Sequence, residues 1–247
     1  MIKAKILSEY KLPKFGNTVA ECEDAFSCNA TRNSLKIVLA DGATESSFAK
    51  EWANLLTNDL VKSRSFSLKH ITGRLPLLRN QWFSEVTKIP LPWYAEAKLE
   101  KGAFSTTLGL WIDFKKQIYS CVAIGDCCLF HIQKDDMIFS FPIFKSNEFS
   151  NSPFLLSTKK DDDKELENYL KTATKKKIEK GDYLFLMSDA LAYWFLNENE
   201  KSERPWEILL GCLEDTSNNA FEKWLNEMRI QKKIKNDDTT LLIIEIT

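Results

Sequence analysis

Acidic residues stand at the ends of several apolar segments of this chain. Two acids precede one such segment, three further segments each end at an acid, and the last segment follows an acidic pair. In that order they are Glu23 and Asp24, then Asp41, Asp126 and Asp189, then Asp237 and Asp238. Strands hold their backbone rigidly, so acids at several strand ends can converge on a hard, oxygen-only site. Two such sites about 3.5–4 Å apart suit Mg²⁺ or Mn²⁺ and can activate a water for in-line attack on phosphorus.

Each of these acids, taken alone, has a simpler interpretation. Aspartate is common at turns and strand ends because its side chain accepts hydrogen bonds from nearby backbone amides. The acids at 135–136 and 161–163 belong to that class. A zinc site built on histidine is disfavoured, since the chain has only His70 and His131. The spacing alone therefore leaves a metal site and ordinary turns as alternatives.

The helices and strands that would position these acids are grouped along the chain. Apolar residues at helical spacing predict helices over residues 46–61, around 77–86, and in two late segments around 206–210 and 221–228. Strands are predicted at 36–40, 104–114, 117–124, 128–133, 137–141, 183–187 and 239–246. Because several strands follow one another through short turns, an α+β fold with antiparallel sheets is favoured over a doubly wound parallel sheet. Neither GxGxxG nor GxxxxGK[ST] occurs, which removes the main support for a nucleotide-binding fold.

The length and net charge of the chain limit the classes of protein to which it can belong. The 247 residues carry 34 Lys and Arg against 35 Asp and Glu, a net charge of −1, so neither nucleic acid nor an anionic membrane is an expected partner. No apolar run approaches the ~18 residues of a membrane span, and the N-terminus does not read as a secretory signal. The six cysteines form no CxxC pair, which indicates reduced, mostly buried thiols in a cytoplasmic protein. Without repeats or linkers, residues 1–247 are expected to form a single domain.

Six short blocks of the sequence share an order and spacing with a known family. They are EDA at 23–25, LADG at 39–42, STT at 105–107, GD at 125–126, MSDA at 187–190 and DDTT at 237–240. In these blocks the chain resembles the type 2C, metal-dependent (PPM) serine/threonine protein phosphatases, in a bacterial-type branch. The resemblance runs from about residue 20 to the end. It implies a four-layer αββα sandwich, with two antiparallel sheets face to face, helices outside, and the acids at one edge of the sheets.

The resemblance also implies a set of metal ligands. Asp24 and Asp41 would bind a pair of Mn²⁺ or Mg²⁺ ions, with Asp41 as the bridge between them. The carbonyl of Gly42 would be a further ligand. Asp189 and Asp237 would hold one of the ions from the other side.

Two more residues receive roles from the same resemblance. Asp126 would help Asp189 to form a third, weaker metal site, and Glu23 would orient metal-bound water. Catalysis would then rest on Glu23, Asp24 and Asp41, and a metal-bridging hydroxide would attack phosphorus without a covalent phosphoenzyme. The implied substrate is a phosphoprotein from a serine/threonine kinase pathway.

Several positions depart from the family pattern. Val19 stands where many members have a phosphate-clamping arginine, and Ala43 where they often have a histidine. Ala190 and the pair Cys127 and Cys128 replace a glycine and a Ser-Arg pair. None of these changes removes a proposed metal ligand, but phosphate affinity and substrate choice depend on them.

Three hypotheses of function follow. The first is an active phosphatase for phosphoserine and phosphothreonine in proteins. The alternative is a catalytically weak relative that serves as a phosphoprotein-binding or regulatory module. A third is a hydrolase of small phosphate esters or nucleotides. Residues 141–180 are either a substrate-shaping flap or an ordinary polar loop, and Trp93 and Tyr94 are expected to pack in the protein rather than line a substrate edge.

Overall fold

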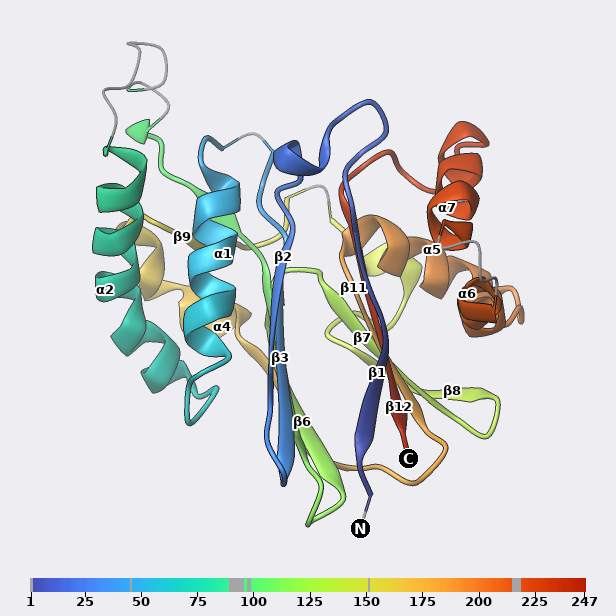
Figure 1. Cartoon of the computed structure of the whole chain (residues 1–247). Coiled ribbons are helices and arrows are strands. Elements are labelled where there is room, and N and C mark those ends of the chain that lie inside the picture. The colour runs from blue at the N-terminus through green and yellow to red at the C-terminus, as the bar shows by residue number, and fades with distance from the viewer. Residues whose placement is uncertain (1, 45, 89–95, 97–98, 151, 215–218) are drawn as a thin grey trace. The chain divides into compact units, whose positions relative to one another are not determined.

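The computed structural model describes residues 2–44, 46–88, 96, 99–150, 152–214 and 219–247 (Figure 1). Trp93 and Tyr94 lie outside the described residues. The chain divides into two compact units. Unit 1 comprises Met1–Cys22, Cys128–Ser152 and Ile178–Thr247, and unit 2 comprises Glu23–Cys127 and Pro153–Lys177. The expectation that residues 1–247 form one domain stays a prediction.

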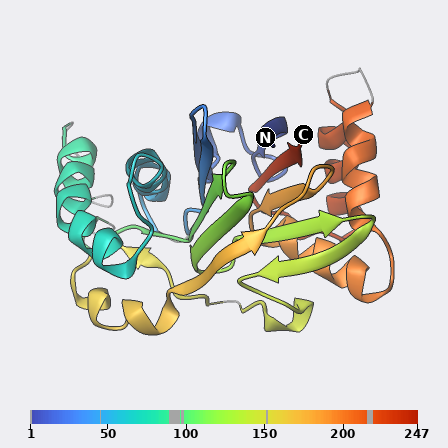
Figure 2. The same cartoon turned by 90° about the horizontal axis from the view of Figure 1, so that it is seen from below.

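Unit 2 contains a five-stranded antiparallel sheet in the order β10-β6-β5-β3-β2. Its strands are β2 (Ala25–Ala30), β3 (Ser34–Ala40), β5 (Thr107–Asp113), β6 (Ile118–Ile124) and β10 (Lys171–Lys177). The helix α1 (Ala49–Leu60) contacts β2 and β3, and α2 (Leu68–Val86) contacts α1 (Figure 2). A short second ladder joins β4 (Phe104–Ser105) to β9 (Leu156–Ser157), and α4 (Leu166–Tyr169) follows it.

The core of unit 2 explains why α1 forms where it does. Apolar residues four apart place Trp52 and Leu56 on one face of the helix, and both side chains are fully buried. They pack against Leu75 and Leu78 of α2 and against Leu156 of β9. The predicted helix around 77–86 begins earlier than expected, at Leu68, after Ser67 caps it by accepting from the backbone N–H of His70.

Unit 1 contains the other five-stranded antiparallel sheet, in the order β1-β12-β11-β7-β8. Its strands are β1 (Ala4–Leu12), β7 (Cys128–Gln133), β8 (Asp136–Phe141), β11 (Tyr183–Met187) and β12 (Thr239–Ile246). Its helices are α5 (Asp189–Glu200), α6 (Pro205–Glu214) and α7 (Ala220–Ile230). Phe130 of β7 stacks on Phe195 of α5 with ring centroids 4.4 Å apart, and this contact anchors the helix on the sheet.

The predicted α+β class with two antiparallel sheets and helices is confirmed. Each unit supplies one five-stranded sheet and its own helices, which are the components of the predicted four layers. Residues 141–180 are more than a plain loop, because they include β9, α4 and the lysine-rich edge strand β10. Lysines on such an edge discourage pairing with another chain.

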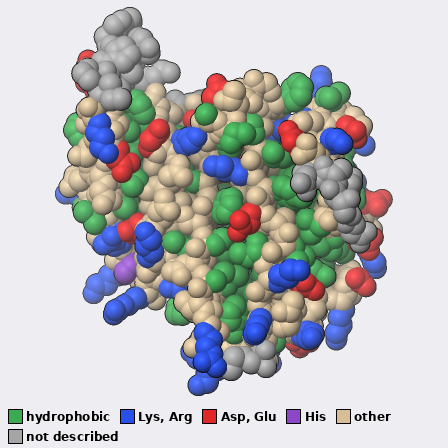
Figure 3. Space-filling model, viewed as in Figure 1, with side chains coloured by type: hydrophobic (Ala, Val, Ile, Leu, Met, Phe, Trp, Pro, Cys, Tyr) green, Lys and Arg blue, Asp and Glu red, His purple; other side chains and the backbone are tan. Residues whose placement is uncertain are grey.

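The surface charges and the helices both agree with the composition. Basic and acidic side chains both occur across the face in Figure 3. Within the described residues, no helix has the length and apolar content needed to cross a membrane.

Candidate metal and catalytic site

The STT block holds the backbone of Asp41, the residue that follows β3. The backbone N–H of Asp41 donates to Thr106 Oγ1 at 3.0 Å. Its carbonyl accepts from the backbone N–H of Thr106 at 2.8 Å and from Ser105 Oγ at 2.9 Å. Gly42 pairs with Ser105 in an isolated β-bridge. Three separate bonds therefore fix the position from which the Asp41 carboxylate projects.

Gly42 lies where no side chain fits. A Cβ at this position would lie 2.9 Å from the carbonyl oxygen of Glu23 and 3.1 Å from Ala49. The close approach brings the backbone of Glu23 beside the Asp-Gly turn. Two blocks separated in sequence, EDA and LADG, are thus neighbours in unit 2.

Three predicted ligands of unit 2, Asp24, Asp41 and Asp126, lie close enough to the Cys127 thiol to act on it electrostatically. Asp24 is fully buried and Asp126 nearly so, and the Cys127 thiol donates to or accepts from Thr106 Oγ1 at 3.0 Å. Burial raises the pKa of the Cys127 thiol, and the carboxylates of Asp41, Asp24 and Asp126 raise it further. The negative charge of all three carboxylates is therefore concentrated in one region of unit 2.

A glycine turn places Asp126 in this group. Gly125 has a φ of +92°, and a Cβ there would lie 2.6 Å from Thr106 Cγ2. Glycine tolerates both the left-handed backbone and the close contact. The Gly-Asp block of the sequence is explained by this turn.

Unit 1 holds the second group, Asp189 and Asp237. Asp189 starts α5, and its Oδ1 accepts from the backbone N–H of Ala190 at 2.6 Å. Asp237 Oδ1 accepts from the backbone N–H of Asp238 at 3.0 Å. The other oxygen of each carboxylate faces the ammonium of Lys235, at 3.9 Å for Asp189 Oδ2 and 2.6 Å for Asp237 Oδ2. Both side chains thus offer an oxygen to the same cation.

Arg229 fixes the loop that carries Asp237. It is 7% exposed, and its guanidinium donates to the carbonyl of Asp237, to Thr239 Oγ1 at 3.0 Å and to the carbonyl of Pro13 at 3.0 Å. Sequence reasoning missed both Arg229 and Lys235. Each is one basic residue in a charged stretch, and no spacing signal distinguishes it from a surface charge.

The donor chemistry fits a hard divalent cation. Across the described residues, no three or more His, Cys, Asp and Glu side chains are clustered as a ready metal site. However, the Lys235 ammonium lies 2.6 Å from Asp237 Oδ2 and 3.9 Å from Asp189 Oδ2, and the carboxylates of Asp24, Asp41 and Asp126 all act electrostatically on the Cys127 thiol. Oxygen donors of this kind suit Mg²⁺ or Mn²⁺ rather than zinc.

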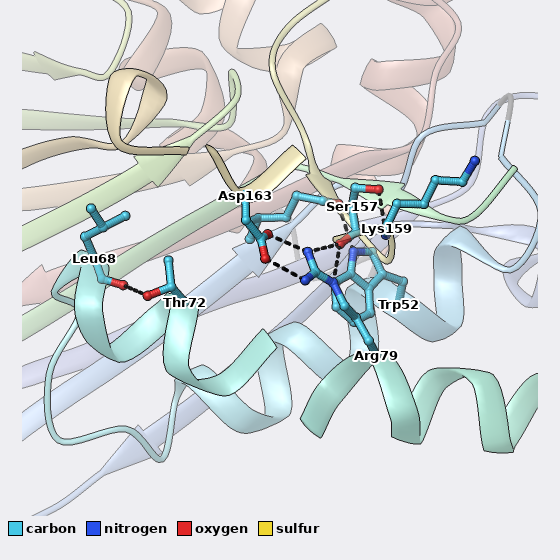
Figure 4. Close-up of polar contacts among 8 residues, drawn as sticks. Trp52, Leu68, Thr72, Arg79, Ser157, Lys159 and Asp163 are labelled. Atoms are coloured by element: carbon cyan, nitrogen blue, oxygen red, sulfur yellow. Dashed lines mark hydrogen bonds and ion pairs between the residues drawn. The ribbon is translucent and has the colours of Figure 1, made fainter. Parts of the chain in front are cut away.

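Arg79 of α2 fastens the segment that follows β9 (Figure 4). Its Nε and Nη2 donate to the carbonyl of Ser157 at 3.2 and 3.0 Å, and its Nη atoms bind both carboxylate oxygens of Asp163 at 2.7 and 2.6 Å. The strand β9 pairs with β4, whose Ser105 holds the Asp41 carbonyl. Arg79 therefore supports the site through β9 and β4.

Replacing Arg79 by methionine is expected to destabilise the protein by about 1–3 kcal/mol, because the Ser157 carbonyl and Asp163 lose their partner at a half-buried position. Chemical denaturation measures the loss. Arg74→Met is the matched control, since Arg74 pairs with Asp59 at a more exposed place on the same helix. An equal loss in both variants would show that Arg79 does not hold the β9 segment.

Comparison with known proteins identifies the class to which this fold and these acids belong. Residues 18–228 match the family described as protein phosphatase 2C. The chain therefore belongs to the protein phosphatase 2C family, and the predicted resemblance is confirmed. No curated protein matches the chain.

Solved structures share the fold at low sequence identity. A bacterial serine phosphatase has a TM-score of 0.60 at 14% identity, covering 100% of this chain and 98% of the other. The serine/threonine phosphatase of S. agalactiae has a TM-score of 0.59 at 12% identity and covers 100% of both chains. RsbX, solved in complex with magnesium, has a TM-score of 0.54 at 19% identity, also over 100% of both chains.

Proposed function

We propose that this chain is a Mn²⁺- or Mg²⁺-dependent phosphatase that removes phosphate from phosphoserine and phosphothreonine in proteins. Membership of the protein phosphatase 2C family over residues 18–228 carries the proposal. The two groups of aspartates support it, because they provide the oxygen donors that such a reaction needs. A kinase pathway as the source of substrate, and a cytoplasmic location, belong to the same proposal.

The residues of unit 2 have separate proposed roles. When bound, the divalent ions would supply an activated water and offset the charge of the phosphoryl oxygens. Asp24 and Asp41 would hold two ions with their carboxylates, and Gly42 would contribute its carbonyl. Glu23 would orient the attacking water, and Asp126 would contribute to a third, weaker site. The bonds from Ser105 and Thr106 hold the backbone of Asp41 in place.

Asp189 and Asp237 of unit 1 are proposed to hold one ion. In each carboxylate, one oxygen is already engaged by the next backbone N–H, which fixes the orientation of the other oxygen. Partners that orient a ligand in this way strengthen metal binding.

Metal removal tests the proposal. The purified protein is expected to hydrolyse p-nitrophenyl phosphate with Mn²⁺, to stop when EDTA is added in excess, and to recover when Mn²⁺ is restored. Activity on phosphoserine and phosphothreonine peptides should exceed activity on free nucleotides, which separates a protein phosphatase from a hydrolase of small esters. A folded protein without turnover at any Mn²⁺ concentration would contradict the proposal.

A catalytically weak, phosphoprotein-binding relative is the second candidate. Val19, at the position of the family's phosphate-clamping arginine, is 64% exposed and has no charge to offer a phosphate. A binding module would retain a phosphopeptide in calorimetry with Mn²⁺ present and would release no inorganic phosphate. Release of phosphate from that same peptide would rule this candidate out.

A further inference from the structure

Lys235 places a positive charge at the carboxylate pair of unit 1. Its ammonium lies 2.6 Å from Asp237 Oδ2 and 3.9 Å from Asp189 Oδ2. The two carboxylates come from different elements, the start of α5 and the loop before β12. A single side chain thus neutralises part of the charge that two separate acids bring together.

The ammonium is held weakly enough to be replaced. The Lys235 side chain is 68% exposed, whereas those of Asp189 and Asp237 are each 23% exposed. Ion pairs with an exposed partner contribute little, because water solvates the free ammonium almost as well. Lysine is a flexible point charge on a four-carbon stem, so it can move into solvent by rotation of its own side chain.

The backbone around Lys235 is fixed by other contacts. Arg229 binds the carbonyl of Asp237, Asn236 Oδ1 accepts from the backbone N–H of Phe15 at 2.7 Å, and Asp238 Oδ1 accepts from that of Lys14 at 2.8 Å. Departure of the ammonium therefore leaves the loop, and the position of Asp237, in place.

We propose that Lys235 is a tethered cation that competes with the divalent ion for the Asp189 and Asp237 carboxylates. It thereby raises the metal concentration at which this pair is loaded, and it keeps the two acids compensated when metal is scarce. The inference rests on the proposed function in one respect only, namely that Asp189 and Asp237 bind metal.

The full chain carrying Lys235→Gln tests this competition. Loss of the ammonium is expected to tighten Mn²⁺ binding at the pair by about two- to fivefold, the range that an ion pair of this exposure supports. Without metal, the variant should unfold at a lower temperature, since the two carboxylates then repel each other uncompensated. Its stabilisation by Mn²⁺ should be larger than that of the parent protein.

Mn²⁺ binding is measured directly, by calorimetry and by the electron paramagnetic resonance signal of free Mn²⁺, without reference to turnover. Lys233→Gln is the matched control, because Lys233 is exposed and lies two residues earlier in the same loop. It should change neither the affinity nor the metal-induced stabilisation. Equal affinities in the parent and the Lys235→Gln variant, or weaker binding in that variant, would overturn the inference.

Two further variants separate this inference from the proposed function. Asp189→Asn and Asp237→Asn should each weaken Mn²⁺ binding, and Asp237→Asn, which removes the nearer partner of Lys235, should reduce the gain caused by Lys235→Gln. If both asparagine variants bind Mn²⁺ like the parent, the ligand assignment fails and the inference fails with it. If they weaken binding while Lys235→Gln changes nothing, only the competition by Lys235 is wrong.

Discussion

Asp41→Asn is expected to lower phosphatase activity by at least ~100-fold, since loss of a mere partner of a metal ligand already costs about 10- to 100-fold. The substitution keeps the shape of the side chain and removes its charge. The backbone bonds to Ser105 and Thr106 do not involve the carboxylate, so they remain. Initial rates on p-nitrophenyl phosphate at saturating Mn²⁺ measure the effect.

The free energy of unfolding of the metal-free protein should rise or stay the same in the Asp41→Asn variant. Asp41 shares its surroundings with Asp24 and Asp126, and all three carboxylates disfavour further negative charge at Cys127. Removal of one charge from this group relieves repulsion when no metal is bound. Asp113→Asn is the control, because Asp113 ends β5 in the same unit and pairs with Lys116 at the surface. A folded Asp41→Asn variant with the activity of that control would show that Asp41 has no catalytic role.

Trp52→Ala is expected to reduce the free energy of unfolding by about 3–5 kcal/mol, the usual cost of deleting a buried tryptophan side chain. Trp52 is fully buried in α1, and its Nε1–H donates to the carbonyl of Leu156 at 2.9 Å. The substitution is expected to leave a cavity between α1 and α2 and an unsatisfied carbonyl in β9.

Trp111 provides the matched control for Trp52. It is 37% exposed on β5 and packs its ring beneath the ammonium of Lys36 at 4.9 Å from the centroid. Trp111→Ala should therefore cost much less, on the order of 1 kcal/mol, in the same urea denaturation experiment. Equal losses in the two variants would contradict the assignment of Trp52 to the core.

Much of the fold was predictable because its signals are local. The apolar run at 36–40 predicts β3 and the run at 239–246 predicts β12, since buried strands need continuous β-branched and aliphatic residues. Strands β1, β2 and β10 escaped prediction. β10 is polar or charged at all positions but one, β1 and β2 mix polar with apolar residues, and their pairing partners, not their composition, make them strands.

The candidate site likewise contains some residues that local sequence signals predict and others that they do not. Asp41 and Asp126 follow strands that the apolar pattern of the sequence predicts, so both were predicted as members of a site. The Thr106 side chain that fixes Asp41 is 65 positions away in sequence, and the guanidinium that fixes Asp237 belongs to a different element. Such contacts depend on the tertiary fold, and a single sequence carries no local signal for them.

Crystals of the full chain grown with Mn²⁺ test the central claim most directly, through the anomalous scattering of manganese. Ions are expected at the carboxylates of Asp24 and Asp41, at the carbonyl of Gly42, and at Asp189 and Asp237, with the Lys235 ammonium displaced from the pair that it now occupies. Manganese bound elsewhere, with these oxygens still engaged only by protein or water, would contradict the assignment of the metal ligands.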